Sequence, residues 1–211
     1  RRSPVSIAPY FLEEVRKTLE RDYGFTGIYR SGLKVYTTLD LDMQKAAYEA
    51  VTSTLNTPGG DPAGALVAID DQGQVKAMMG GTDFANDPFN LASGGGGVGR
   101  QAGSTFKTFV LAAAIDKGID PDTSYYVSAP FTYRPAETGS CDDGSWWCVK
   151  TYDSTYNGWT SVSRATLRSD NAVYAQLTLD VGPENVGEMA RKLGVRSPLE
   201  VGGQYVPAMG L

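Results

Sequence analysis

The sequence predicts a mixed fold of the α+β class, and three observations support this prediction. Apolar residues recur at helical spacing in several segments, most clearly after Ser104 and after residue 161. Two apolar runs within residues 63–81 flank a turn around Asp71 to Gly73, which is the pattern of a β-hairpin. The chain has 211 residues, of which 41% are hydrophobic and 20% charged. A chain of this size and composition can form a folded domain with a sizeable core.

The first 32 residues have the character of a connector. Their start is polar and irregular, Pro9 then opens a helical pattern, and we expect Gly24 and Gly27 to end that helix. We therefore interpret residues 1–32 as a connector and residues 33–211 as part of the main domain.

The main domain begins with a segment rich in β-forming residues, 32–40, which predicts a strand. Asp40 can cap a following helix over residues 41–55. The predicted hairpin at 63–81 comes next and, in this interpretation, is the only source of central strands. The later strands of the sheet are therefore expected to be missing from this chain.

The clearest helical pattern covers Ser104 to Lys117, where apolar residues form a wide face and Gly118 ends the helix. Residues 119–160 are rich in aromatic residues, proline and glycine, so we expect more loop than regular structure there. Further helices are predicted at residues 161–167, 172–181 and 183–193.

Composition excludes several classes of function. Lysine and arginine total 19 against 24 acidic residues, a formal charge of −5, and no basic run is present that would bind nucleic acid. The longest apolar stretch, Phe109 to Ile115, is too short to cross a bilayer. The chain has no histidine, which removes Ser-His-Asp triads and most catalytic zinc sites. The base of an acyl-transfer enzyme would have to be a lysine, a carboxylate or a terminal amine.

The two cysteines, Cys141 and Cys148, flank an Asp143-Gly144 pair that is typical of a turn. A turn would bring the two thiols together, which favours a local disulfide, and two free thiols are the alternative. A disulfide would place the protein in an oxidising compartment outside the cytosol.

Ser104 is a candidate nucleophile because Lys107 follows it by one helical turn, on the same face. A hydroxyl at a helix N-terminus lies near unpaired backbone N–H groups, which stabilise developing negative charge. The neighbouring Phe106 and Phe109 suggest apolar surroundings, which would lower the lysine pKa toward the value of about 7–8 that suits a general base. The alternative is that Ser104 only caps the helix and Lys107 is a solvated surface residue.

A second Ser-x-x-Lys string, Ser31 to Lys34, lies before the predicted strand, where the two side chains would not converge. A second polar motif, Ser169-Asp170-Asn171, interrupts the helical pattern about 65 residues after Ser104. A serine and lysine on a buried helix, followed by Ser-Asp-Asn between two helices, resemble the penicillin-recognising serine enzymes.

The resemblance is closest to the N-terminal portion of the transpeptidase domain of class A, bifunctional penicillin-binding proteins. It covers nearly the whole chain, through the segments 9–30, 33–44, 99–109 and 166–177. It implies the transpeptidase fold shared by penicillin-binding proteins and β-lactamases. It also implies that residues 1–32 connect to an upstream glycosyltransferase domain.

The resemblance assigns a role to each motif residue. Ser104 would attack a stem peptide ending in D-Ala-D-Ala to form an acyl-enzyme, with its own backbone N–H as half of the oxyanion hole. Lys107 would take the serine proton, Ser169 would relay a proton to the leaving amine, and Asn171 would position the substrate. Asp170 is expected to point away. An amine of a second stem peptide would then complete the cross-link, β-lactams would acylate the same serine, and no metal or cofactor would be needed.

The third motif of that family, Lys-Thr/Ser-Gly, has no counterpart in this sequence, and the nearest string, Lys150-Thr-Tyr, precedes Ser169. We therefore expect a complementary chain or segment to carry the rest of the transpeptidase domain, and we expect this chain by itself to be inactive. The resemblance implies a location on the extracytoplasmic face of the bacterial cell membrane, with the membrane anchor outside this chain.

Two alternatives remain within the same fold. A class A β-lactamase would carry a Glu-x-x-Leu-Asn string after Ser-Asp-Asn, and residues 198–211 contain none. A non-catalytic β-lactam sensor, or a surface adhesion module of similar fold, would differ in activity and not in motifs. The connector and the segment leading into Ser104 favour the cell-wall synthase.

Overall fold

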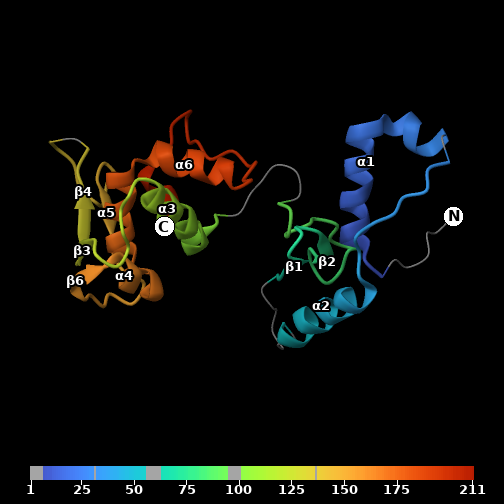
Figure 1. The fold of residues 1–211 in the computed structure, drawn as a ribbon, viewed down its shortest axis with the longest axis horizontal. Coiled ribbons are helices and arrows are strands. Elements are labelled where there is room, and N and C mark those ends of the chain that lie inside the picture. Colours follow the sequence, from blue (N-terminus) through green and yellow to red (C-terminus); the bar gives the residue numbers. More distant parts are fainter. Residues whose placement is uncertain (1–6, 31, 56–62, 95–100, 136) are drawn as a thin grey trace. The chain divides into compact units, whose positions relative to one another are not determined.

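The computed structural model describes residues 7–30, 32–55, 63–94, 101–135 and 137–211. The chain divides into two compact units, residues 1–100 and 101–211, and each is described separately (Figure 1). This division concerns packing alone, and the boundary between connector and main domain after residue 32 stays a prediction.

The first unit contains two helices, α1 (Pro9–Arg30) and α2 (Leu41–Thr54). Helix α1 does not end at Gly24 as the sequence predicted. The chain kinks there (φ 69°, ψ 162°) and helical turns resume up to Arg30, because glycine adopts this conformation without steric cost. Asp40 caps α2 as predicted, and its carboxylate accepts hydrogen bonds from the first turn of the helix.

The prediction of a strand over residues 32–40 is wrong. Residues 33–40 have no regular secondary structure. Near its end the segment touches the neighbouring hairpin, where Asp40 N donates to Lys76 O at 2.9 Å and the Thr38 hydroxyl donates to Val75 O at 2.6 Å. High β-propensity is not sufficient for a strand, because a strand also needs a partner in register.

The predicted hairpin is confirmed. Strands β1 (Leu66–Ile69) and β2 (Val75–Met79) pair antiparallel, and a turn closed by the Gly73 N–H on Asp70 O joins them. Helix α2 packs against both strands. Its buried Gln44 hydrogen-bonds the backbone N–H and C=O of Met78, so the side-chain amide takes the place of a neighbouring strand. A small apolar core lies between helix and hairpin, made of Ala47, Val51, Ala77 and Met79.

The second unit is built on three mutually packed helices (Figure 1). These are α3 (Lys107–Asp116), α5 (Asn171–Val181) and α6 (Pro183–Lys192), and a short helix α4 (Val162–Arg168) precedes α5. The ends of α4, α5 and α6 lie within about one residue of the predicted bounds. The unit also contains the 3₁₀ turns η1 (Gly103–Phe106) and η2 (Pro207–Gly210).

Residues 119–160 contain more loop than regular structure, as expected, but the sequence did not predict the short strands that lie there. Four short strands form two antiparallel pairs in this region, β3 with β6 and β4 with β5. Their bounds are Tyr125–Ser128, Phe131–Tyr133, Trp147–Val149 and Gly158–Ser161 for β3 to β6 in order.

The core of the second unit lies between α3, α5 and α6. Tyr174 and Leu177 of α5, Val110 of α3 and Val186 of α6 are fully buried in one cluster. Burying this apolar surface holds the three helices together and thereby fixes the first residue of α3 against the first residue of α5. That fixed relation positions the site described below.

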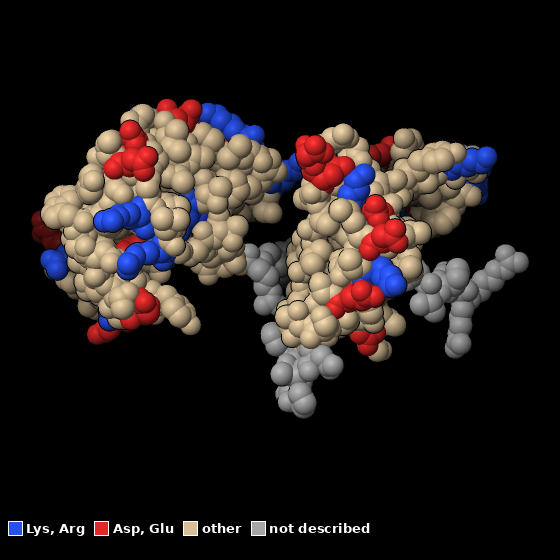
Figure 2. Space-filling view, turned by 60° about the horizontal axis from the view of Figure 1, so that its bottom comes forward, with Lys and Arg blue, Asp and Glu red and all other residues tan. Residues whose placement is uncertain are grey.

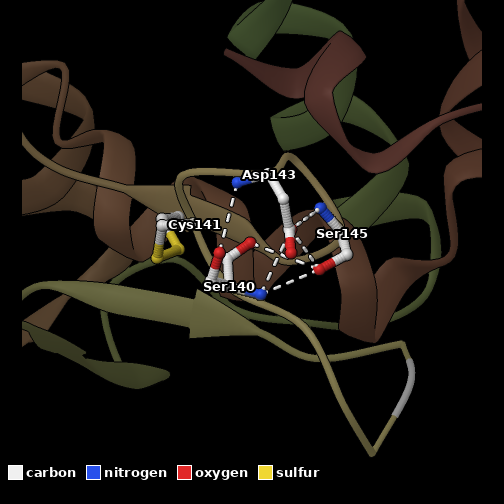
Figure 3. The surroundings of a disulfide bond; sticks show 5 residues. Ser140, Cys141, Asp143 and Ser145 are labelled. Atoms are coloured by element: carbon white, nitrogen blue, oxygen red, sulfur yellow. Dashed lines mark hydrogen bonds between the residues drawn. A yellow bond between two sulfur atoms is a disulfide. The ribbon is translucent and has the colours of Figure 1, made fainter.

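Cys141 and Cys148 form a disulfide, as the turn signal favoured, with their Cα atoms 5.7 Å apart. The intervening loop is ordered by its own polar groups (Figure 3). The Asp143 carboxylate accepts hydrogen bonds from Ser145 and from Ser140 N, and these bonds lower the pKa of Asp143 to about 2. The bridge joins the start of this loop to β5.

Charged side chains of both signs are mixed over the visible surfaces of both units (Figure 2). None of the described helices is long and apolar enough to cross a membrane. Within the described ranges, no group of three or more histidine, cysteine, aspartate or glutamate side chains could hold a metal ion.

Candidate active site

The centre of the site is Lys107, the first residue of α3, whose side chain is only 5% exposed. Its Nζ atom donates to three oxygens of the α4–α5 junction: Ser169 O at 2.7 Å, Ser169 Oγ at 3.0 Å and Asn171 Oδ1 at 2.6 Å. It also lies 5.3 Å from the centre of the Tyr174 ring. The amino group of Lys107 thereby binds two residues, Ser169 and Asn171, that follow it in the sequence by 62 and 64 positions.

Burial changes the acid–base chemistry of this amine. Removing the ammonium from water lowers the pKa of Lys107 from 10.5 to about 8, and the negative charge of Asp170 partly opposes the shift. All three donations require the ammonium form. The neutral amine keeps two N–H donors, so one of the three contacts is given up, and the lone pair that replaces the third N–H can accept a proton from a hydroxyl. The site therefore provides a base that is usable near neutral pH.

The junction has the shape needed to surround the lysine. Ser169 ends α4 in the left-handed conformation (φ 53°, ψ 42°), which is uncommon for a residue other than glycine. Asp170 then caps α5, with its Oδ1 accepting from Val173 N at 3.1 Å. This sharp turn leaves the Ser169 hydroxyl and carbonyl and the Asn171 amide all directed at Lys107.

Asp170 points away from the lysine, as the resemblance implied, and is almost fully buried (2% exposed). Its Oδ2 atom accepts a hydrogen bond of 2.5 Å from the buried hydroxyl of Ser128, at the end of β3. The Ser128 Oγ in turn accepts from Asn157 N at 3.0 Å. A chain of hydrogen bonds therefore ties the junction to β3 and to the loop before β6.

Ser104 lies in the 3₁₀ turn η1, just before α3, and not in the α-helix that the sequence predicted from that residue. Its side chain is exposed and lines a cavity of about 480 Å³ together with Ser169 and Asn171. Among the described residues, the lysine Nζ has its three contacts at the junction, and the Ser104 hydroxyl is not one of them. Ser104 therefore lines the cavity without a hydrogen bond to the lysine.

The alternative interpretation of Ser104 and Lys107 is wrong. No side-chain hydrogen bond caps η1 or α3, so Ser104 is not a helix cap, and Lys107 is buried and not solvated. The competing Ser-x-x-Lys string cannot be compared in the same way, because Ser31 lies outside the described residues.

Sequence reasoning missed several other residues that line the cavity. Asp153, Thr155 and Asn157, from the loop between β5 and β6, line it together with Arg168 at the end of α4. The Lys150 carbonyl, on the same loop, accepts from Asn171 Nδ2 at 3.2 Å. These positions match no motif, and the pairing of β4 with β5 and of β3 with β6 brings their loop to the site.

A mixed fold in which a helix-borne lysine meets a Ser-Asp-Asn turn is the arrangement of penicillin-recognising proteins. Comparison with known proteins agrees. The family model described as "Penicillin binding protein transpeptidase domain" matches residues 64–206. The chain belongs to this family, and the predicted family and fold are confirmed.

Individual relatives carry the same names. The chain is 32% identical to penicillin-binding protein 2D of Bacillus subtilis over 97% of its own length and 28% of that protein's length. It is 36% identical to penicillin-binding protein 1A of Neisseria meningitidis over 64% of its length, which is 16% of that protein. The chain thus spans less than a third of the curated relatives it matches.

Solved structures show the same relation. The penicillin-binding protein PonA1 from Mycobacterium tuberculosis superimposes with a TM-score of 0.77 at 27% identity, over 96% of this chain and 52% of that one. PonA1 in complex with penicillin V gives a TM-score of 0.72 at 30% identity, over 92% of this chain and 48% of that one. The chain therefore corresponds to about half of each solved chain.

Proposed function

We propose that this chain is the N-terminal part of a peptidoglycan D,D-transpeptidase domain that cross-links stem peptides through an acyl-enzyme on Ser104. The observation that carries the proposal is the buried Lys107 amine, held by Ser169 and Asn171 beside a cavity that Ser104 lines. The family to which the chain belongs supports the same reaction class.

In the proposed acylation step, Ser104 Oγ attacks the carbonyl of the penultimate D-Ala and its proton passes to neutral Lys107. The tetrahedral intermediate collapses, the peptide bond to the terminal D-Ala breaks, and Ser169 delivers a proton to the leaving amine. In the second step the amine of another stem peptide attacks the ester and Ser104 regains its proton. Asn171, whose Nδ2 atom is directed at the Lys150 carbonyl, would hold the substrate amide in place.

β-Lactams would acylate the same serine, because they resemble the D-Ala-D-Ala dipeptide. The relative PonA1 was solved in complex with penicillin V, which supports this part of the proposal. The proposed enzyme acts on the extracytoplasmic side of the bacterial membrane, where the Cys141–Cys148 disulfide is compatible with the redox conditions. A Lys-Thr/Ser-Gly segment would complete the substrate site.

The test is covalent labelling of the full-length protein with penicillin, followed by intact mass measurement and peptide mapping. We expect one stable adduct on Ser104, and none in Ser104→Ala. Ser31→Ala, which removes the serine of the competing Ser-x-x-Lys string, should label as the wild type does. Labelling elsewhere, or none, would refute the assignment of the nucleophile.

Two further measurements separate the alternatives. Rapid turnover of a chromogenic β-lactam, with no lasting adduct, would indicate a β-lactamase. A stem peptide supplied with an acceptor amine should give a cross-linked product that is absent in Ser104→Ala. Stable penicillin labelling without any such product would indicate a non-catalytic sensor.

A further inference from the structure

The cavity that Ser104 lines also contains an arginine that the proposed reaction does not use. Arg168 is the last residue of α4, directly before Ser169, and its exposed side chain lines the same cavity as Ser104. In the part of the chain that the structure describes, its guanidinium makes no hydrogen bond and no salt bridge. Its five N–H donors are therefore available to a ligand.

The neighbouring carboxylate does not neutralise this arginine. Asp153 Oδ1 accepts from Thr155 N at 3.0 Å and from the Thr155 hydroxyl at 2.7 Å, which fixes the carboxylate on its own loop. The charge of Arg168 still reaches Asp153, because it contributes to lowering the pKa of that carboxyl group. Arg168 therefore lies within the field of an anchored carboxylate without being paired to it.

We propose that Arg168 forms an anion subsite beside the acylation site. This subsite binds a side-chain carboxylate of the peptide substrate. This inference rests on the proposed function, since it names the class of acyl donor that the same cavity prefers. Lys107 cannot bind this anion, because it is buried and its three contacts are taken up at the junction. Among the described residues that line the cavity, Arg168 is the cation left to do so.

The chemistry of the wall favours a carboxylate over a phosphate. A planar guanidinium pairs with a carboxylate through two parallel N–H···O bonds. Asp153, which lines the same cavity, would repel a dianion more strongly than a monoanion. The cavity volume of about 480 Å³ is in the range of sites that hold small ligands or short peptide segments.

The first experiment measures the second-order rate of acylation of the full-length protein by two penicillins. Both have the same bicyclic nucleus, and they differ by one carboxylate on the acylamino side chain. We expect Arg168→Ala to slow acylation by the carboxylated probe about 10-fold or more and to change the rate with the neutral probe by less than about 3-fold. Arg168→Lys should lie in between, because it keeps the charge but loses the planar fork.

Arg164→Ala is the matched control, since Arg164 is an exposed arginine on the same helix that does not line the cavity. It should leave both rates unchanged. The difference in acylation rate between the carboxylated and the neutral penicillin should also become smaller at high salt, because the subsite is open to solvent. An equal loss of rate with both probes in Arg168→Ala, or no loss with either, would overturn the inference.

A binding measurement keeps the inference separate from the proposed function. In Ser104→Ala, calorimetry would compare a peptide ending in D-Ala-D-Ala that has a side-chain carboxylate with its carboxamide counterpart. We expect the carboxylate peptide to bind about 10-fold more tightly, and the preference to disappear when Arg168→Ala is added. No preference would refute the subsite even if Ser104 proves to be the nucleophile. If the peptides show this preference but the wild-type protein is not acylated at Ser104 in the penicillin-labelling test, the subsite is supported and the proposed reaction is refuted.

Discussion

At the scale of single residues, the most consequential feature is that one lysine is placed where its charge is costly. Lys107 loses contact with water and gains three hydrogen-bond acceptors, and the net result is a pKa of about 8. At pH 7 roughly one-tenth of such lysines are neutral, compared with about 0.03% of lysines with a pKa near 10.5. Burial alone therefore raises the concentration of the active base by more than two orders of magnitude.

The first prediction follows from this pKa. Only neutral Lys107 can accept the serine proton, so the second-order rate of penicillin acylation should rise about tenfold per pH unit below pH 8 and level off above it. A lysine with an ordinary pKa would instead give a rate that keeps rising to about pH 10. The measurement is a pH–rate profile with a fluorescent penicillin on the full-length protein.

Asp170 supplies the control for this profile. Its charge opposes the lowering of the lysine pKa, so Asp170→Asn should move the midpoint to lower pH. Asparagine can still cap α5 through its Oδ1 atom, and its Nδ2 atom, in place of the carboxylate oxygen that accepts from Ser128, can donate to Ser128 Oγ, which limits damage to the fold. A midpoint near pH 10 in the wild type, or a shift to higher pH in Asp170→Asn, would contradict the role given to Lys107.

At the scale of secondary structure, the site depends on how the α4–α5 junction is attached to the strands. Ser128 ends β3 and links Asp170 to the backbone of Asn157, so one hydroxyl joins two walls of the cavity. All three of these groups come from different elements. Their connection holds the junction in its left-handed turn, which the chain would otherwise adopt only at a cost of about 1 kcal/mol or more.

The second prediction tests this link. Ser128→Ala removes both hydrogen bonds at a position that is only 1% exposed, and it should lower the free energy of unfolding by about 1–3 kcal/mol. Penicillin acylation should also slow, because the junction that holds Lys107 becomes less fixed. Urea denaturation and acylation rates measure the two effects.

The matched control is Ser163→Ala. Ser163 also donates a hydrogen bond to an aspartate of another segment, Asp122, but that bond is exposed to water. Its loss should cost less than about 0.5 kcal/mol and leave the acylation rate unchanged. Equal effects of the two substitutions would show that the Ser128 link has no special part in the site.

The elements also show what the sequence can and cannot predict. Helices α2, α4, α5 and α6 were found within a few residues of their true ends, because helical periodicity and caps are local signals. Strands β3 to β6 were missed, since each has only three or four residues and β3 pairs with a strand about 30 residues away. Nothing local records that pairing.

The same distinction applies within the site. The sequence could name four site residues because they match motifs: Ser104, Lys107, Ser169 and Asn171. The structure brings Lys107 of the first motif into contact with Ser169 and Asn171 of the second. Arg168 and Ser128 have no motif, and their place at the cavity depends on tertiary packing. The kink at Gly24 was misjudged for a related reason, because a glycine can either end a helix or bend it, and local sequence does not decide between the two.

At the scale of the whole chain, the described residues form a separate apolar core in each unit, and these two cores share no residue. The core of the first unit is small and lies between α2 and the hairpin, whereas that of the second lies between α3, α5 and α6. The candidate active site belongs entirely to the second unit. A perturbation of one core should therefore not be transmitted to the other, since no buried side chain is common to both.

The third prediction concerns this independence. Leu177 is fully buried in the core of the second unit, and Leu177→Ala should destabilise that unit by about 3 kcal/mol through lost apolar contacts and a residual cavity. Protected amides of α3, α5 and α6 should then exchange with solvent deuterium about 100-fold faster, while those of β1 and β2 keep their wild-type rates.

Gln44→Ala is the reciprocal change. It leaves the backbone N–H and C=O of Met78 without their buried partner, so it should loosen the hairpin by about 1–3 kcal/mol and leave α5 unaffected. Hydrogen–deuterium exchange with mass spectrometry resolves both units in one experiment. If Leu177→Ala accelerated exchange in β1 and β2 by the same factor as in α5, the chain would unfold as a single cooperative body. Stability changes far from Lys107 would then reach the site from either unit.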